Sequence, residues 1–242
     1  MTDRTVETSP QLYARIGGVL YLIIIVAGGF AELFVRDKLI VAKDAAATAS
    51  NIMASESLWR IGFAATLVML VCAVVLTMIF YVLLRPVNRN IALLMAFFNL
   101  MDIAIESINN LHHFAALLIL GGADYLKAFE PHQLQALALL STKLFNYGYG
   151  IGLVFFGFES IFRGYLIFKS GFFPRILGTL VVISGLSYVT NSFVLFLSRL
   201  HWDWLLVPAG IPELILCLWL IVMGVNGPKW QEKASAAAIS GA

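Results

Sequence analysis

The stretch IGFAATLVMLVCAVVLTMIFYVLL, residues 61–84, contains no charged side chain over its whole length. A helix needs about 20 consecutive apolar residues to cross a hydrocarbon core of ~30 Å, so this stretch predicts a transmembrane helix. The composition agrees, because 60% of the 242 residues are hydrophobic, only 12% are charged and the mean hydropathy is +0.89. Soluble domains carry about 25% charged residues. The sequence therefore excludes an ordinary soluble domain.

Five further apolar runs of similar length occur along the chain. The complete set of predicted spans is 16–35, 61–84, 91–120, 144–167, 176–198 and 205–225. Their continuity favours helices over barrel strands, which alternate polar and apolar residues over ~10 positions. We therefore expect an all-α, polytopic membrane helix bundle with six transmembrane helices. The transmembrane domain is expected at 16–225, between an N-terminal segment, 1–15, and a disordered C-terminal tail, 226–242.

The loops between the spans predict the orientation of the bundle. The turn RPVNRN carries Arg85 and Arg89, and the turn KSGFFPR carries Lys169 and Arg175, with no acidic residue in either. Short loops rich in Lys and Arg face the cytoplasm. With an even number of spans, both termini are then cytoplasmic.

Two helix starts are expected outside these turns. Asp44 is suited to cap a helix across 45–59, which either lies on the membrane or lengthens the second span. Glu130 and Pro131 fit the start of a helix that runs into the fourth span.

Charge and cysteine content exclude several classes of protein. The net charge of +2 is too small and too dispersed for nucleic-acid binding. Cys72 and Cys217 lie far apart in apolar runs, so they form neither a disulfide framework nor a CxxC motif. HExxH, GxSxG and phosphate-loop motifs are absent in usable contexts, and no cofactor is predicted. The expected partners are the lipid bilayer and a small solute or cation.

Polar side chains gather on one face of the third predicted span. At 100° per residue, six of them fall within an arc of roughly 100°; they are Asn99, Asp102, Glu106, Asn109, Asn110 and His113. A charge in hydrocarbon costs at least ~2.5 kcal/mol, so this stripe faces other helices or water. One interpretation is a binding site. The other is that the stripe only joins helices by interhelical hydrogen bonds, which average ~0.6 kcal/mol each.

Other spans place polar residues at a similar depth, in the outer half of the predicted bundle. We interpret these positions as an outward-facing polar cavity, and the candidate binding residues are Asp102, Glu106, Asn109, Asn110, His113, Lys143, Asn191 and Glu213. Lys143 is either the counter-ion of Glu106 or Asp102 or a side chain that snorkels to the interface. Glu159 and Arg163, four residues apart, are interpreted as a structural pair along one helix.

Three functions remain open at this stage. The first is the binding or transport of a small solute or a cation. Because the chain is short and lacks obvious inverted repeats, a complete transport pathway could require a homo-oligomer. The second is a membrane-embedded enzyme in which Glu106 and His113 act as acid, base or metal ligands. The third is a noncatalytic scaffold. No metal-binding motif accompanies Glu106 and His113, so the sequence leaves open whether these residues bind a metal.

Several stretches resemble a bacterial family catalogued as domain of unknown function 4386. They include ARIGGVLYLIIIVAGGFAELFVRDKLIV, DAAATASNIMASESLWRIGF, YVLLRPVNRNIALL and YGYGIGLVFFGF, and they lie within 14–198. The resemblance implies a multi-helix protein of the bacterial inner membrane. It implies no activity, because no activity is established for the family.

Overall fold

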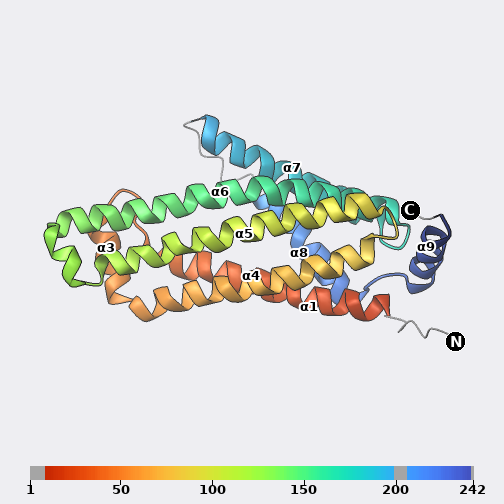
Figure 1. Ribbon diagram of the computed structural model, residues 1–242, viewed down its shortest axis with the longest axis horizontal. Helices are drawn as coiled ribbons and strands as arrows, with labels where there is room; N and C mark the ends of the chain where they lie inside the picture. The colour runs from red at the N-terminus through yellow and green to blue at the C-terminus, as the bar shows by residue number, and fades with distance from the viewer. Residues whose placement is uncertain (1–8, 199–205, 241–242) are drawn as a thin grey trace. The chain divides into compact units, whose positions relative to one another are not determined.

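The computed structural model describes residues 9–198 and 206–240, and every regular element within these ranges is a helix (Figure 1). In chain order the elements are α1 (Pro10–Gly29), the π-helical η1 (Phe30–Arg36), α2 (Asp37–Leu39), α3 (Ala45–Ala54), α4 (Glu56–Leu84), α5 (Arg89–Leu120), the 3-10 helix η2 (Asp124–Ala128), α6 (Pro131–Ser170), α7 (Arg175–Leu197), α8 (Leu206–Val222) and α9 (Gly227–Ser240). The prediction of an all-α fold is confirmed.

Within the described ranges, five helical segments are long and apolar enough to cross a membrane. They are Pro10–Leu39, Glu56–Leu84, Arg89–Leu120, Pro131–Ser170 and Arg175–Leu197. A sixth follows if Ala209–Val222 and Gly227–Ile239, which meet at an angle of 99°, are counted as one span. The polytopic bundle is thus confirmed with five to six spans. The sixth predicted span, 205–225, corresponds to α8, and its first residue lies outside the described ranges.

Two predicted helix starts are also observed. Asp44 Oδ1 accepts a hydrogen bond of 2.9 Å from Ala47 N and so caps α3. Helix α6 begins at Pro131, where the missing proline N–H costs nothing because the first turn has no partner for it. For this reason α6 starts well before the apolar run that marks the fourth span.

The C-terminal tail differs from the expectation of disorder, because α9 covers most of it. Asn226 Oδ1 accepts a hydrogen bond of 3.2 Å from Lys229 N at the start of α9. Trp230 Nε1 donates to Leu83 O at 2.9 Å and fixes α9 to the end of α4. A capped, alanine-rich segment with one anchored aromatic ring has the local propensity and the tertiary contact that a helix needs.

The chain divides into two compact units, which we describe separately. Unit 1 contains the described parts of 1–22, 73–102 and 153–242, and unit 2 contains 23–72 and 103–152. In unit 2 the core is made of Val35, Leu39, Ile52, Trp59, Ala116, Leu117 and Ala138, all less than 9% exposed.

In unit 1 helices α6 and α7 approach closely at glycines. A Cβ at Gly178 would lie 2.6 Å from Gly164 O, and one at Gly157 would lie 2.8 Å from Gly185 O. Small residues at such crossings are typical of membrane helices, where backbones pack without a hydrophobic driving force. These contacts hold α6 against α7. Helix α6 carries the buried charged pair of unit 1, Glu159 and Arg163.

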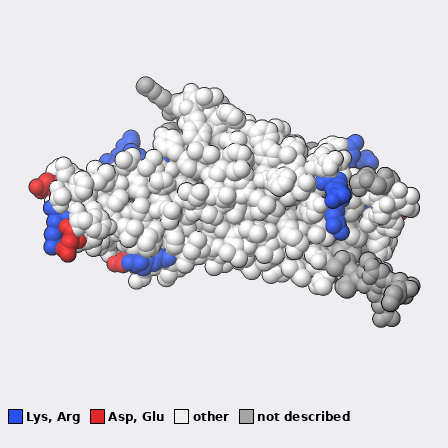
Figure 2. Space-filling view, in the orientation of Figure 1, with Lys and Arg blue, Asp and Glu red and all other residues white. Residues whose placement is uncertain are grey.

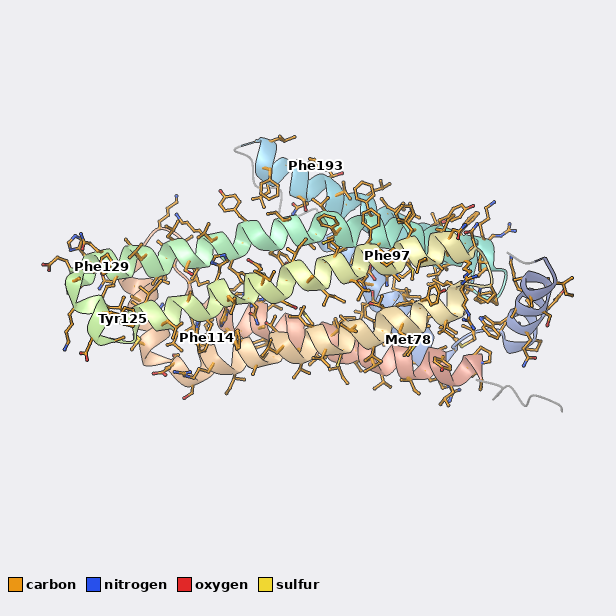
Figure 3. All side chains as sticks on the ribbon, in the orientation of Figure 1. Met78, Phe97, Phe114, Tyr125, Phe129 and Phe193 are labelled. Atoms are coloured by element: carbon orange, nitrogen blue, oxygen red, sulfur yellow. The ribbon has the colours of Figure 1, made fainter. Side chains whose placement is uncertain are left out.

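The molecular surface suits a lipid environment. On the face shown in Figure 2, charged side chains are confined to small patches and most of the surface carries none. Large apolar side chains such as Met78, Phe97 and Phe193 are between 48% and 59% exposed (Figure 3). Soluble proteins rarely leave large contiguous apolar surface uncovered, so this exterior agrees with membrane insertion.

Candidate functional site

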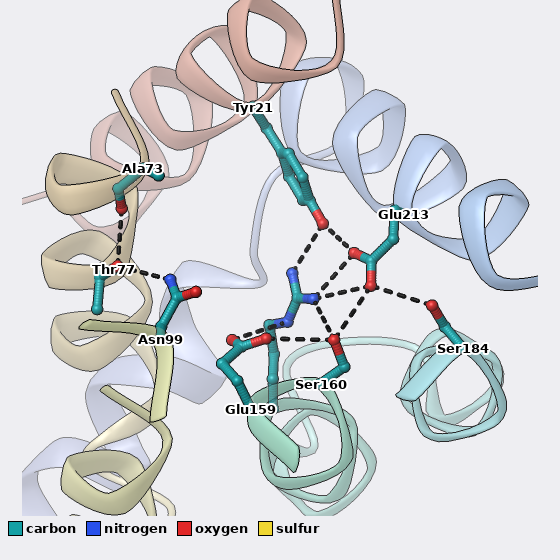
Figure 4. Close-up of polar contacts among 9 residues, drawn as sticks. Tyr21, Ala73, Thr77, Asn99, Glu159, Ser160, Ser184 and Glu213 are labelled. Carbon is teal, nitrogen blue, oxygen red and sulfur yellow. Dashed lines mark hydrogen bonds and ion pairs between the residues drawn. The ribbon is translucent and has the colours of Figure 1, made fainter. Parts of the chain in front are cut away.

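Unit 1 contains a buried network of charged and hydroxyl side chains, which we call the Arg163 network. It consists of Tyr21, Glu159, Ser160, Arg163, Ser184 and Glu213, contributed by α1, α6, α7 and α8 (Figure 4). All six residues are at most 5% exposed. Helix α6 supplies three of them, because Glu159 and Arg163 lie one turn apart and Ser160 follows Glu159 directly.

Arg163 is the centre of this network. Its Nε lies 3.2 Å from Glu159 Oε1, and its Nη2 lies 2.9 Å from each carboxylate oxygen of Glu213. Its Nη1 donates to the Tyr21 hydroxyl at 2.9 Å. The guanidinium therefore links two acidic side chains and one phenol, which come from three different helices.

Glu213 receives more hydrogen-bond donors than Glu159. The Tyr21 hydroxyl donates to Glu213 Oε2, and Ser184 Oγ lies 3.2 Å from Glu213 Oε1 (Figure 4). Ser160 Oγ lies between the two acids, 3.2 Å from Glu159 Oε2 and 3.3 Å from Glu213 Oε1. Glu213 follows Pro212 inside α8, and Ser184 Oγ also reaches Ala209 O in that helix, at 2.6 Å.

Aromatic rings surround the guanidinium on its other sides. The Arg163 Cζ atom lies 5.1 Å from the ring centroid of Phe80, 5.7 Å from that of Tyr21 and 5.9 Å from that of Phe156. A cation near such ring faces is attracted by their quadrupoles. The rings also exclude water, so the charges of the network interact in a medium of low polarity.

The network contains more acid than base. Among the described residues, the charged groups that face Arg163 are Glu159 and Glu213, and the Tyr21 phenol is the remaining titratable group. Two ionised carboxylates and one guanidinium sum to a net charge of −1. A neutral network therefore includes one proton or one further cation.

A shorter polar chain joins α5 to α4 in the same unit. Asn99 Nδ2 donates to Thr77 Oγ1 at 2.6 Å, and Thr77 Oγ1 donates to Ala73 O at 2.7 Å (Figure 4). Asn99, part of the predicted stripe, thus forms an interhelical hydrogen bond.

Unit 2 holds the central part of that stripe. Glu106, Asn109, Asn110 and His113 lie on one face of α5 and are between 0% and 6% exposed. Asn109 Nδ2 donates to Phe145 O at 3.0 Å on α6, and Asn110 Nδ2 donates to Phe63 O at 3.5 Å on α4. The stripe therefore joins three helices of unit 2 by hydrogen bonds.

Several acceptors of the stripe lack partners. Within the described part of the chain, Glu106 Oε1, Asn109 Oδ1 and Asn110 Oδ1 are buried and have no hydrogen-bond partner. Buried polar atoms are nearly always paired, so three unpaired oxygens within one helical turn are unusual. Gly148 on α6 makes room for one of them, because a Cβ there would collide with Asn109 Oδ1.

His113 is held by a reciprocal contact with Trp59. Trp59 Nε1 donates to His113 O at 2.9 Å, and His113 Nε2 lies 3.0 Å from Trp59 O. Their rings stack with centroids 4.1 Å apart. The crevice beside them, lined by Arg36, Ile40, Trp59, His113, Thr142 and Phe145, has no room for a water molecule.

The eight residues predicted to bind a ligand are divided between the two units. Asp102, Asn191 and Glu213 belong to unit 1, and Glu106, Asn109, Asn110, His113 and Lys143 belong to unit 2. The Lys143 side chain is exposed, and no ion pair between described residues includes it. Within the described ranges, no group of three or more His, Cys, Asp or Glu side chains could hold a metal ion.

Sequence reasoning missed most of the Arg163 network. The predicted pair of Glu159 and Arg163 is present, but Arg163 also binds Glu213 and Tyr21, which are far away in the sequence. One signal was available: Arg163 and Glu213 are both ionisable residues within apolar spans, and such residues normally pair.

Comparison with known proteins identifies the family. The sequence profile described as "Domain of unknown function (DUF4386)" matches residues 16–224, which is most of the chain. The chain belongs to this family. An uncharacterized protein of Archaeoglobus fulgidus is 27% identical over 144 residues, which cover 60% of this chain and 72% of the archaeal one. No solved structure matches the chain significantly. Membership confirms the predicted resemblance and carries no activity with it.

Proposed function

We propose that this DUF4386 protein binds and releases a proton inside the membrane, with the Arg163 network as the proton site. The observation that carries the proposal is the acid surplus, two carboxyl groups around one guanidinium, all at most 5% exposed. An unpaired charge buried in protein costs several kcal/mol. A proton on one carboxyl removes that cost.

We assign the proton to Glu159. Glu213 accepts two hydrogen bonds from Arg163 Nη2 and one from Tyr21, which together favour its ionised form. Among the described residues, Glu159 has only the 3.2 Å contact with Arg163 Nε and one with Ser160. The carboxyl with fewer donors gains least from ionisation, so it holds the proton.

Release of this proton would leave the network negatively charged. The Glu159–Arg163 attraction would then strengthen at the expense of the Arg163–Glu213 pair, which joins α6 to α8. A change in charge that alters contacts between helices is how proton binding biases two conformations of a membrane protein. The chemistry is that of proton-coupled binding or transport.

The proposal also includes the location and orientation of the protein. We place it in the bacterial inner membrane, as the family resemblance favours, with both termini in the cytoplasm, as the basic turns favour.

The proton can be detected by infrared spectroscopy of the purified protein. A protonated carboxyl group has a C=O stretching band that a carboxylate lacks. Glu159→Gln should remove one such band at neutral pH and leave the fold intact, because glutamine resembles the protonated acid. Glu213→Gln should also remove it, because Arg163 then has a single acidic partner. Glu130→Gln, at the exposed start of α6, is the control and should change nothing. An unchanged band in both network variants would refute the proton assignment.

Proteoliposomes test whether the bound proton moves. If the network lies on a proton path, the wild-type protein should accelerate the decay of an imposed pH gradient, and Glu159→Gln should reduce the decay to that of empty liposomes. A wild-type rate that persists in Glu159→Gln would place the path elsewhere.

The unpaired oxygens of unit 2 favour a second candidate, the binding of a small monovalent cation. Carboxylate and amide oxygens are ligands that hard cations prefer, and Glu106, Asn109 and Asn110 each present one that has no hydrogen-bond partner among the described residues. A cation that binds only the folded state raises stability by ~2.7 kcal/mol at 100 times its Kd.

This candidate predicts that Na⁺ raises the melting temperature of the purified protein whereas choline, which is too large, does not. Glu106→Gln should abolish the Na⁺ effect, and Glu130→Gln should retain it. Equal melting temperatures of the wild-type protein in Na⁺ and choline at constant ionic strength would eliminate the cation site.

A further inference from the structure

We infer that unit 1 has a binding site for a phosphate-bearing anion, in the hollow between the α4–α5 turn and α9. This hollow of about 280 Å³ is separate from the Arg163 network and has no part in the proposed proton chemistry. It is lined by Tyr81, Arg85, Pro86, Arg89, Trp230, Ala234, Ala237 and Ala238. The volume is just below the usual range of small-molecule pockets, so it suits a headgroup-sized ligand.

The charge of the lining selects for anions. Arg85 and Arg89 supply two guanidinium groups, and no acidic residue is among the lining residues. Neither arginine forms an ion pair with another described residue, whereas the exposed Arg60 pairs with Glu56. Arginine binds phosphate through paired hydrogen bonds from its guanidinium group, so two guanidinium groups that have no ion pair with a described residue suit a phosphate ligand in this hollow.

The wall opposite the arginines is held in place. Trp230 Nε1 binds Leu83 O, and Lys233 Nζ binds Lys169 O at 3.0 Å, so two contacts fix α9 against the ends of α4 and α6. Asn226 N also donates to Phe172 O at 3.2 Å, just before α9 begins. A preformed wall lowers the ordering cost of binding.

The lining also has an apolar part. The ring of Trp230 and three alanines of α9 lie beside the arginines. Rings of this kind prefer the interface between membrane and water, where phospholipid headgroups are found. Helix α9 meets α8 at 99°, as expected of a helix that lies along a membrane surface at the end of a span. The hollow therefore suits a ligand that has a phosphate group beside a small apolar group. Such a ligand is either an anionic lipid or a soluble phosphate.

A binding experiment with the full-length protein distinguishes these sources. The protein in phosphatidylcholine nanodiscs is titrated with short-chain phosphatidylglycerol, glycerol phosphate or inorganic phosphate, and isothermal titration calorimetry measures binding. Binding of phosphatidylglycerol alone identifies a lipid site, and binding of the soluble phosphates identifies a site for phosphate itself; either supports the inference.

Matched variants distinguish specific binding in the hollow from general attraction of anions to basic side chains. The double variant Arg85→Gln/Arg89→Gln should bind at least about tenfold more weakly, because two charge-assisted hydrogen bonds are lost. Lys169→Gln/Arg175→Gln removes the same charge from the other basic turn and should bind like the wild type. Ala234→Trp fills the hollow, keeps both arginines and should also abolish binding. Failure of every probe to bind, or equal weakening by the two double variants, would overturn the inference.

Discussion

Arg163→Met should destabilise the protein by ~3–5 kcal/mol, because it leaves two carboxyl groups buried without their guanidinium partner. The side chains of Arg163 and Glu159 are each 2% exposed, so water cannot replace the lost contacts. Denaturant unfolding in detergent micelles, followed by circular dichroism, measures the change in the free energy of unfolding.

The chain contains a matched control for this prediction. Arg60 pairs with Glu56 at 2.7 Å with the same spacing of four residues, but the two side chains are 53% and 44% exposed. Surface pairs contribute ~0–1 kcal/mol, so Arg60→Met should have little effect. The triple variant Arg163→Met/Glu159→Gln/Glu213→Gln should recover much of the loss, because it removes the uncompensated charge. Similar losses for Arg163→Met and Arg60→Met would contradict the buried network.

Trp59→Ala should have an effect of similar size, ~3–5 kcal/mol, because it empties a large volume in the core of unit 2. The indole is fully buried, stacks on His113 and donates to His113 O. Its removal leaves a cavity and takes one hydrogen-bond donor away from a carbonyl group on α5. The same unfolding measurement checks the prediction.

Trp59→Phe separates the two contributions to this loss. Phenylalanine retains a ring against His113 but cannot donate a hydrogen bond, so it should cost ~0.5–1.5 kcal/mol, the net contribution of one hydrogen bond. A phenylalanine variant as unstable as the alanine variant would mean that the hydrogen bond, rather than the filled volume, stabilises this contact.

Local signals in the sequence predicted most of the secondary structure. The apolar run 61–84 lies within α4, and Asp44 caps α3 as its side chain and position indicated. The tail was different: 226–242 is polar and alanine-rich, and the contact that fixes it is a hydrogen bond from Trp230 to Leu83, far away in the sequence. A tertiary contact of this kind leaves no periodic pattern in the chain.

The candidate sites were predictable to a smaller extent. The face of α5 that carries Glu106, Asn109, Asn110 and His113 follows from helical periodicity, and these residues are buried. Lys143 was interpreted either as a counter-ion or as a side chain that snorkels to the interface, and its side chain is exposed. Helical periodicity gives the direction of a side chain on its own helix, but it does not give the neighbouring helix that the side chain meets.

The amino-acid sequence is sufficient to predict a helical membrane protein, because the length and apolarity of a span are local properties that the thickness of the bilayer selects. It also determined which few polar residues must avoid lipid. How these residues pair depends on the packing of the helices. Tyr21, Arg163, Ser184 and Glu213 lie on four helices and meet through α6–α7 glycine contacts and a proline-containing α8. The energy of a buried charge depends on the groups within a few ångströms of it, and helix packing alone brings those groups together.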